Sequence, residues 1–231
     1  MSADLRVVPD DRALARRAAE WLVAKARAAV AARGACAVAL AGGTTPRAAY
    51  EVLATSALAR ALPWGAIDWY FGDERAVPFD HPDSNYRLAS ETLFAGRPEA
   101  LDRARRMPAD AADADAAARA YSLLLPDPID VLLLGLGEDG HTASLFPGQP
   151  AGDAPGSPDV LAVHGAPKPP PERVTLSVAR LARARRVVFL VTGPDKRAAV
   201  AAWRRGGELP ARLIAPAGEV EVLLDADADA K

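Results

Sequence analysis

Four short apolar runs, each followed directly by glycine or polar residues, constrain the fold of this chain most strongly. They are 35-ACAVALA-41, 66-AIDWYF-71, 129-IDVLLL-134 and 186-RVVFLVTG-193. Short, continuously apolar runs are typical of strands buried on both faces in a parallel sheet. Parallel strands need crossover connections, and helical patterns lie between these runs. The sequence therefore predicts an α/β fold with a mostly parallel, doubly wound sheet.

The segments between the runs supply the expected helices. Residues 11–33 carry apolar side chains at helical spacing, with Asp10 or Asp11 available as N-cap and Gly34 as the stop. Other helices are expected at about 46–61, 85–94, 109–124 and 195–205, with a short one between strands 173–178 and 186–192. A last strand is expected at 219–224. The proline- and glycine-rich stretch 147–171 is expected to be a long surface loop, with a possible strand at 159–163.

Length and composition limit the organisation and partners of the chain. At 231 residues, it is expected to form one domain over 1–231, and the low-complexity acidic tail 225–231 is expected to fray. The formal net charge of −2 gives no electrostatic reason to expect nucleic acid or an acidic membrane as partner. The apolar runs are much shorter than the roughly 20 residues of a membrane span. The oligomeric state stays open, and a monomer is compatible with the sequence.

Cysteine usage and the first residues indicate the compartment. Cys36 is the single cysteine, so an intrachain disulfide is impossible. The N-terminal residues MSADLRVVPD carry no apolar signal core. Both observations favour a reducing, cytoplasmic environment.

The loop after the first run has the chemistry of a phosphate site. In 42-GGTTPR-47, Gly42 and Gly43 let backbone N–H groups approach an anion, and Thr44 and Thr45 add hydroxyl donors. The predicted helix that follows adds a favourable dipole. The alternative is a tight strand-to-helix turn with Thr45 as the helix cap.

Other charged side chains are expected at the same edge of the sheet, because the carboxyl ends of parallel strands form the ligand-binding edge. Lys196 follows the fourth run, and lysine is rare here: four of the 28 basic residues are lysines. Asp73 and Arg75 follow the second run. Asn85 and Arg87 reach this edge only if the loop before them folds back. For Lys196, Asp73 and Arg75, the alternative is a solvated surface side chain.

The stretch 135-GLGEDGH-141 satisfies G-x-G-x-x-G, the pattern of a dinucleotide-binding loop. Glu138 and Asp139 would repel a pyrophosphate there, and no acidic residue ends a second strand about 20 residues later. His141 follows on the same turn, where Asp139 or a carbonyl could fix its tautomer and leave the other nitrogen free as a base. We therefore interpret these glycines as the support of a catalytic histidine rather than as a cofactor loop.

Two other reaction classes lack support in the sequence. No cysteine and histidine cluster has metal-ligand spacing, and no G-x-S-x-G nucleophile elbow is present. Neither a metal nor a cofactor is expected. A histidine that acts on water, near cations and near hydrogen-bond donors for a phosphate group, indicates hydrolysis of a small phosphorylated substrate.

Four segments together resemble the 6-phosphogluconolactonase family in order and spacing, and with their connections they span most of the chain: 41-AGGTTPRAAYEVL-53, 72-GDERAVPFDHPDSNYRLASETL-93, 135-GLGEDGHTASLFPG-148 and 172-ERVTLSVARLARARRVVFLVTGPDK-196. The resemblance implies a modified Rossmann-like sheet similar to those of glucosamine-6-phosphate deaminase and ribose-5-phosphate isomerase. It also implies metal-free hydrolysis of 6-phospho-D-glucono-1,5-lactone to 6-phosphogluconate, the second step of the pentose phosphate pathway.

Glucosamine-6-phosphate deaminase is the nearest alternative, since it shares the GGTTP-like loop, the Asp-Glu pair and the Asp-Gly-His turn. Its turn carries a glutamate five residues after the histidine, where this chain has Phe146. Its tyrosine after Asp-Glu is replaced by Arg75. These departures favour the lactonase. A non-catalytic sugar-phosphate sensor, which would not need His141, is the alternative from another class.

The resemblance and the loop positions together assign roles to twelve residues. His141 is expected to activate water, Arg75 to stabilise the oxyanion or orient the product carboxylate, and Asp73 and Asp139 to orient these groups. The residues expected to bind the phosphorylated sugar lactone are Gly42, Gly43, Thr44, Thr45, Arg47, Asn85, Arg87 and Lys196.

Overall fold

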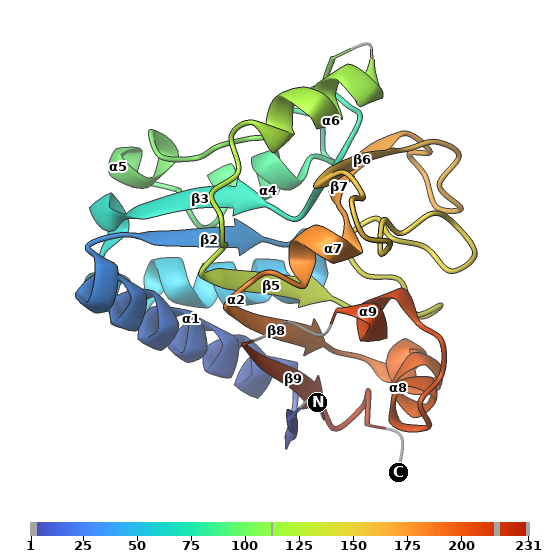
Figure 1. Ribbon diagram of the computed structural model, residues 1–231. Helices are drawn as coiled ribbons and strands as arrows, with labels where there is room; N and C mark the ends of the chain where they lie inside the picture. The colour runs from blue at the N-terminus through green and yellow to red at the C-terminus, as the bar shows by residue number, and fades with distance from the viewer. Residues whose placement is uncertain (1–3, 112, 215–217, 230–231) are drawn as a thin grey trace.

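A six-stranded parallel sheet occupies the centre of the computed structural model, which describes residues 4–111, 113–214 and 218–229 (Figure 1). Its strands pair in the order β1-β9-β8-β5-β2-β3. In that order they span Asp4–Val8, Glu219–Asp225, Arg186–Val191, Val131–Gly135, Cys36–Leu40 and Ile67–Phe71. The predicted parallel sheet is confirmed, and the four apolar runs form its four adjacent strands β8, β5, β2 and β3.

The direction of each crossover decides which face a helix covers. The helices are α1 Asp11–Arg33, α2 Thr44–Thr55, α3 Leu58–Ala61, α4 Asn85–Glu91, α5 Pro98–Leu101, α6 Ala114–Ser122, α7 Val178–Leu181, α8 Arg197–Arg204 and α9 Pro210–Leu213. Connections containing α1 and α2 move along the sheet towards β3, whereas those with α7 and α8 move away from it. Right-handed crossovers therefore put α1 and α2 on one face and α7 and α8 on the other.

Helix α1 begins and ends where the sequence indicates. The Asp10 carboxylate accepts a hydrogen bond from the backbone N–H of Ala13 at 2.8 Å, which caps the first turn. Gly34 ends the helix in the left-handed conformation, with φ of 79°. The buried side of α1, which includes Leu14, Ala18 and Leu22, packs on the sheet.

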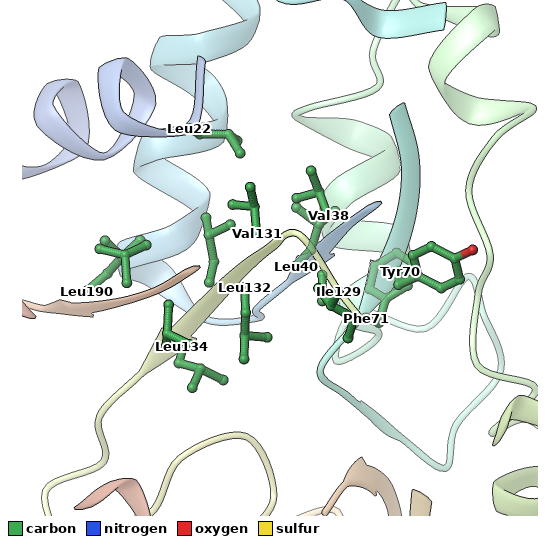
Figure 2. Packing of buried hydrophobic residues seen from close by; sticks show 14 of the residues in the cluster. Leu22, Val38, Leu40, Tyr70, Phe71, Ile129, Val131, Leu132, Leu134 and Leu190 are labelled. Atoms are coloured by element: carbon green, nitrogen blue, oxygen red, sulfur yellow. The ribbon is translucent and has the colours of Figure 1, made fainter. Parts of the chain in front are cut away.

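The sheet and these helices enclose one large apolar core. Figure 2 shows aliphatic side chains of β2 and β5, among them Val38, Leu40, Val131 and Leu132, packed beside Leu190 of β8 and Leu22 of α1. All five residues of β2 are buried, as a strand covered on both faces requires. This core holds the carboxyl ends of the strands in fixed positions.

A second, antiparallel sheet lies beside the ends of these strands. It contains β4 (Asp73–Arg75), β7 (Arg173–Leu176) and β6 (Val160–Val163), in the order β4-β7-β6. The possible strand at 159–163 is therefore confirmed. Asp73 and Arg75, which were expected directly after the second apolar run, belong to this second sheet: β4 pairs with β7 after a break at Gly72, whose carbonyl accepts a hydrogen bond from Leu176.

Some elements differ from their predicted bounds. The expected helix 46–61 is two helices, because Ser56 is extended and its hydroxyl accepts a hydrogen bond from Leu58 N. The expected helix 109–124 begins at Ala114, where Asp113 caps it through Ala116 N. Strand β1 was not predicted, because its side chains are mostly exposed and it has no continuous apolar run.

The acidic tail makes specific contacts over residues 225–229. Asp225 is the last residue of β9, and its buried carboxylate accepts hydrogen bonds from Gly193 N at 3.1 Å and from Ala228 N at 2.7 Å. Ala228 is itself buried. Through these hydrogen bonds, the Asp225 carboxylate connects the end of β9 to the loop after β8 and to the turn at Ala228. Residues 230–231 lie outside the described residues.

Candidate active site

A cavity of about 300 Å³ opens at the carboxyl ends of the parallel strands. The loops that follow β2, β5 and β8 form much of its wall, together with Asp73 and Arg75 of β4. Lys168, Pro169 and Arg173, from the segment that enters β7, close another side. The cavity therefore lies where a parallel sheet is expected to bind its ligand.

Glycine shapes the turn that carries His141. The backbone N–H of Gly137 donates to the His141 carbonyl at 2.8 Å, and Gly140 closes the turn with a φ of 87°. A Cβ on Gly137 would lie 2.0 Å from His141 Nδ1, so the imidazole packs directly over this residue. No helix follows in residues 136–159, all of which the structure describes. The G-x-G-x-x-G residues thus form a compact turn under an imidazole.

The imidazole of His141 is held from two sides. Its Nδ1 lies 2.5 Å from Asp139 Oδ1, and its ring packs on Phe146 with centroids 4.8 Å apart. Because a carboxylate accepts, Nδ1 carries the hydrogen in the neutral ring and Nε2 keeps its lone pair. Burial raises the pKa of Asp139, but its hydrogen bonds with His141 outweigh that effect and lower the pKa. Asp139 therefore stays ionised and fixes the tautomer.

Asp73 is a buried junction between three segments. Its Oδ2 accepts a hydrogen bond from Ser144 Oγ at 2.6 Å, and its Oδ1 accepts one from Asn85 Nδ2 at 3.2 Å. The Asn85 amide also donates to the Asp73 carbonyl at 2.8 Å. The loop before α4 therefore does fold back, and Asn85 reaches the site as a support for Asp73 and Gly42.

The GGTT loop provides a helix N-terminus at the cavity wall. Gly43 is the N-cap of α2 with a φ of 99°, a conformation that favours glycine. The first N–H groups of any helix lack partners within that helix, and here Gly43 and Thr44 border the cavity. The alternative role of Thr45 as cap is wrong, because its hydroxyl instead lies 2.5 Å from that of Thr192. This contact joins the loops after β2 and β8.

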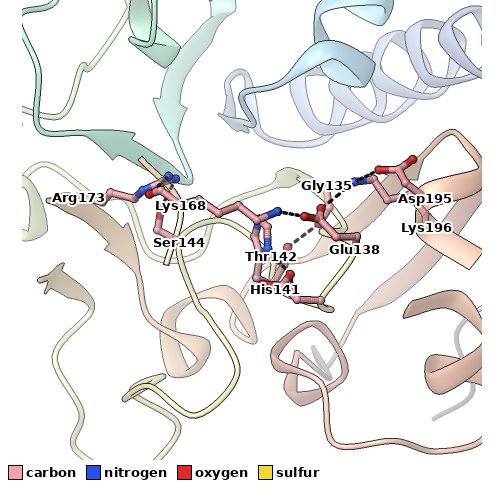
Figure 3. Close-up of polar contacts among 10 residues, drawn as sticks. Gly135, Glu138, His141, Thr142, Ser144, Lys168, Arg173, Asp195 and Lys196 are labelled. Carbon is pink, nitrogen blue, oxygen red and sulfur yellow. Dashed lines mark hydrogen bonds and ion pairs between the residues drawn. The ribbon is translucent and has the colours of Figure 1, made fainter. Parts of the chain in front are cut away.

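Two lysines converge on one carboxylate beside the cavity, as Figure 3 shows. Lys168 Nζ lies 2.5 Å from Glu138 Oε1, and Lys196 Nζ lies 3.4 Å from Glu138 Oε2 and 2.8 Å from Asp195. The hydrogen bond from Lys168 lowers the pKa of Glu138 to about 2. An incoming phosphate would compete with these carboxylates for the two ammonium groups.

Two arginines line another part of the cavity. Arg75 donates from one terminal nitrogen to the Asp83 carbonyl at 2.6 Å, whereas its buried Nε has no partner among the described residues. Arg173 is buried and donates to Ser144 Oγ at 3.4 Å and to backbone carbonyls of the preceding segment. Burial lowers the pKa of Arg173, and the nearby Asp73 charge opposes that shift. Both guanidinium groups are positioned by protein contacts before any substrate enters.

The structure brings together most of the residues predicted from sequence. His141, Asp73, Arg75, Lys196 and the GGTT loop line the cavity, with Asp139 and Asn85 directly behind them. Two of the predicted residues, Arg47 and Arg87, do not line the cavity. Arg47 lies 3.9 Å from Glu51 on α2, and Arg87 contacts Glu91 and the Asp80 carbonyl.

Sequence analysis missed three residues of the site, namely Lys168, Arg173 and Ser144. Lys168 carried a usable signal, because it is one of four lysines in an arginine-rich chain. Arg173 and Ser144 carried none, since their positions depend on how β7 and the 142–146 segment pack against β4.

Neither a metal cluster nor a membrane helix is found in the part of the chain that the structure describes. No group of three or more His, Cys, Asp or Glu residues in 4–111, 113–214 and 218–229 could hold a metal ion. In the same ranges, no helix has the length and apolar composition needed to cross a membrane.

Comparison with known proteins gives one consistent family. Residues 9–223 match the family described as glucosamine-6-phosphate isomerases/6-phosphogluconolactonase. The chain is 38% identical to the 6-phosphogluconolactonases of Synechocystis sp. and Mycobacterium tuberculosis. Each alignment covers at least 98% of the relative's sequence. It superposes on the 6-phosphogluconolactonase of Trypanosoma brucei with a TM-score of 0.86 and 32% identity, covering 98% of this chain and 97% of that one.

Proposed function

Because this chain belongs to the glucosamine-6-phosphate isomerase/6-phosphogluconolactonase family, we propose that it hydrolyses 6-phospho-D-glucono-1,5-lactone to 6-phosphogluconate. In metabolism this reaction would be the second step of the pentose phosphate pathway. The observation that carries the proposal is the pairing of His141 with Asp139 at the wall of a cavity that also holds two lysines and a helix N-terminus.

The phosphate group of the substrate would bind between α2 and the two lysines. The backbone N–H groups of Gly43 and Thr44 supply hydrogen bonds, and the α2 dipole favours a negative charge. Lys196 and Lys168 supply mobile positive charges, which can leave Glu138 when the more highly charged phosphate arrives. Arg47 does not line the cavity, and we propose no contact between its guanidinium group and the phosphate.

His141 would act as a general base and then as a general acid. Its Nε2 takes a proton from water as the water oxygen attacks the lactone carbonyl, which forms a tetrahedral oxyanion. The ring C–O bond then breaks, and His141 returns the proton to the departing ring oxygen. Asp139 stabilises the imidazolium that exists between these two steps, because it stays ionised beside Nδ1.

Arg75 would stabilise the oxyanion or orient the product carboxylate. It lines the same cavity as His141, and its buried Nε lacks a partner among the described residues. Preorganised donors of this kind typically contribute a few kcal/mol to transition-state stabilisation. Arg173 lies on the same side and adds a second positive charge at that position.

The deaminase alternative lacks the acid that its turn would require. Phe146 stands five residues after His141, where the deaminase has a glutamate, and it is buried against the imidazole. An apolar ring at this position supports His141 by packing and cannot relay a proton. This observation favours water activation over ring opening of an amino sugar.

A pair of assays tests the proposal. Enzymatically generated 6-phosphogluconolactone should disappear faster with the protein than without it, and one proton should be released for each lactone hydrolysed. The same preparation should release no ammonia from glucosamine-6-phosphate. Ammonia release would favour the deaminase, and binding of sugar phosphates without any turnover would favour the sensor.

A further inference from the structure

A second cavity, of about 440 Å³, lies at the opposite edge of the main sheet. It is bordered by the residues that lead into β5, β8 and β9, so it faces the amino ends of these strands. The six residues of β8 separate it from the candidate active site by about 20 Å. Its charged lining consists of one glutamate, Glu219, and four arginines: Arg33, Arg183, Arg185 and Arg186.

Two of these arginines share one carboxylate. Arg33 donates to Asp130 Oδ1 at 2.6 Å, and Arg185 Nε lies 3.3 Å from the same oxygen. The other oxygen of Asp130 accepts a hydrogen bond from Ala37 N at 2.9 Å. Asp130 carries one negative charge, so it neutralises only one of the two guanidinium charges.

The positive charge of Arg186 is compensated less than those of Arg33 and Arg185. Its Nε lies 3.5 Å from Glu219 Oε2, which already accepts a hydrogen bond from Lys25 at 2.8 Å. The Nε is buried and has no hydrogen-bond partner among the described residues. A buried donor on a charged group loses its hydration when it has no hydrogen-bond partner, so the environment of this Nε favours an additional acceptor.

The remaining arginine is already neutralised. One terminal nitrogen of Arg183 donates to both oxygens of the Asp159 carboxylate, at 2.7 and 2.8 Å. The Nε of Arg183 lies 3.4 Å from Asp127. The uncompensated positive charge therefore comes from the remaining cations. Asp130 and Glu219 are the carboxylates that pair with Arg33, Arg185, Arg186 and Lys25. Two carboxylates against four cations leave a local charge of about +2.

We propose that this cavity binds a doubly charged phosphate group, either free phosphate or a small phosphate monoester. A phosphate dianion matches the local charge, and its oxygens can accept from the guanidinium forks of Arg185 and Arg186. The cavity volume falls in the range of small-molecule sites. This site is separate from the lactone cavity and does not depend on the proposed reaction.

Amide NMR of the labelled full-length protein separates the two cavities. Titration with inorganic phosphate should shift the amides of 184–187 and 34–37 in one saturable process, and those of 42–44 in another. Replacing Arg185 and Arg186 together by Gln should weaken the first process at least tenfold and leave the second unchanged. Each substitution removes one charge and one ion pair, that of Arg185 with Asp130 or that of Arg186 with Glu219.

The matched control removes two charges elsewhere. Arg12 and Arg60 are exposed and line neither cavity, so Arg12→Gln/Arg60→Gln should keep the wild-type phosphate response. Equal weakening in both double variants, or equal shifts with chloride at matched ionic strength, would overturn the proposal. If the first double variant does not fold, Arg185→Gln alone supplies the same comparison against Arg60→Gln. A parallel titration with adenosine monophosphate distinguishes the ester, which would then bind more tightly, from free phosphate.

Discussion

At the scale of single residues, His141 depends on groups that prepare it before substrate binds. Asp139 fixes the tautomer, Phe146 fixes the ring plane, and Gly137 leaves the space that the imidazole fills. Each of these contacts acts on a different property of the same ring. They can therefore be removed one at a time.

Removing the imidazole should abolish most of the chemistry. His141→Ala is expected to lower kcat for lactone hydrolysis about 10²–10⁴-fold, because general base catalysis by a positioned histidine contributes that much. His164→Gln is the control, since His164 is an exposed histidine that does not line the cavity. Steady-state kinetics with both variants decides the point, and near-normal turnover by His141→Ala would remove the central claim.

Lys196 should act mainly on binding. Lys196→Ala is expected to raise KM about tenfold or more while kcat changes less, because a charge-assisted contact to phosphate contributes about 1.5–3 kcal/mol. Lys25→Ala removes the same charge from a position outside the cavity and serves as the control. An unchanged KM in Lys196→Ala would reject the phosphate role.

Gly137 tests the space under the ring. In Gly137→Ala the new Cβ would start 2.0 Å from His141 Nδ1, so the imidazole must move away from Asp139. We expect kcat to fall at least tenfold, since displacements of about 1 Å can cost much more than that. Gly65→Ala, at a position with open space around the Cβ, is the matched control. Kinetics equal to the wild type would show that the ring tolerates the shift.

At the scale of elements, the hydroxyl of Ser144 connects the segment 142–146 to β4 by donating a hydrogen bond to Asp73. Ser144→Ala would leave the buried Asp73 carboxylate without its 2.6 Å hydrogen bond, which should lower the free energy of unfolding by about 1–3 kcal/mol. Because His141 leads into this segment, kcat should fall as well. Ser90→Ala, whose hydroxyl bonds within its own helix, should change stability by less than about 0.5 kcal/mol. Urea unfolding monitored by tryptophan fluorescence measures both; equal values would contradict the role of Ser144.

The sequence predicts elements whose signal is local. The runs around Val38 and Leu132 are apolar throughout because both faces of their strands are covered, and that pattern is visible without a structure. Asp10, Ser84 and Gly34 likewise act on backbone groups a few residues away. Local chemistry therefore predicts most of the main sheet and its loops.

Other features depend on contacts between distant segments. β1 is an exposed edge strand that pairs only with β9 in the main sheet, so its own residues carry little signal. Lys168 and Arg173 reach the cavity because β7 pairs with β4, which the sequence does not specify. Arg47 contacts Glu51 on α2 instead of lining the cavity, because a position next to a binding loop does not determine which side of the helix a residue occupies.

At the scale of the whole molecule, one exposed histidine connects the small sheet to α6. His164 Nδ1 lies 2.5 Å from Glu172, and its Nε2 lies 3.3 Å from Asp115. The hydrogen bond with Glu172, and then that with Asp115, raises the pKa of His164. Its contribution to stability is therefore fully present below the unfolded pKa of about 6.5 and is lost as pH rises through the folded pKa.

His164→Gln should accordingly lower Tm by about 1–3 °C near pH 5.5 and by less than about 1 °C near pH 9, since the ion pairs are exposed and screened by solvent. Differential scanning calorimetry at the two pH values tests this expectation. His81→Gln, in a loop outside α6, controls for loss of a histidine. An equal Tm difference at both pH values would contradict the charge-based explanation.

The pairing of β1 with β9 also has a consequence for biosynthesis. β1 is synthesised before the other strands of the main sheet and its partner β9 after them, and β9 must insert between β1 and β8. The indole of Trp21 in α1 donates a hydrogen bond to Glu221 of β9 at 2.6 Å, so this contact also forms only after β9 has been synthesised. We therefore expect the sheet to close only once β9 has been synthesised, with β1 and the exposed flank of β8 shielded by chaperones until then.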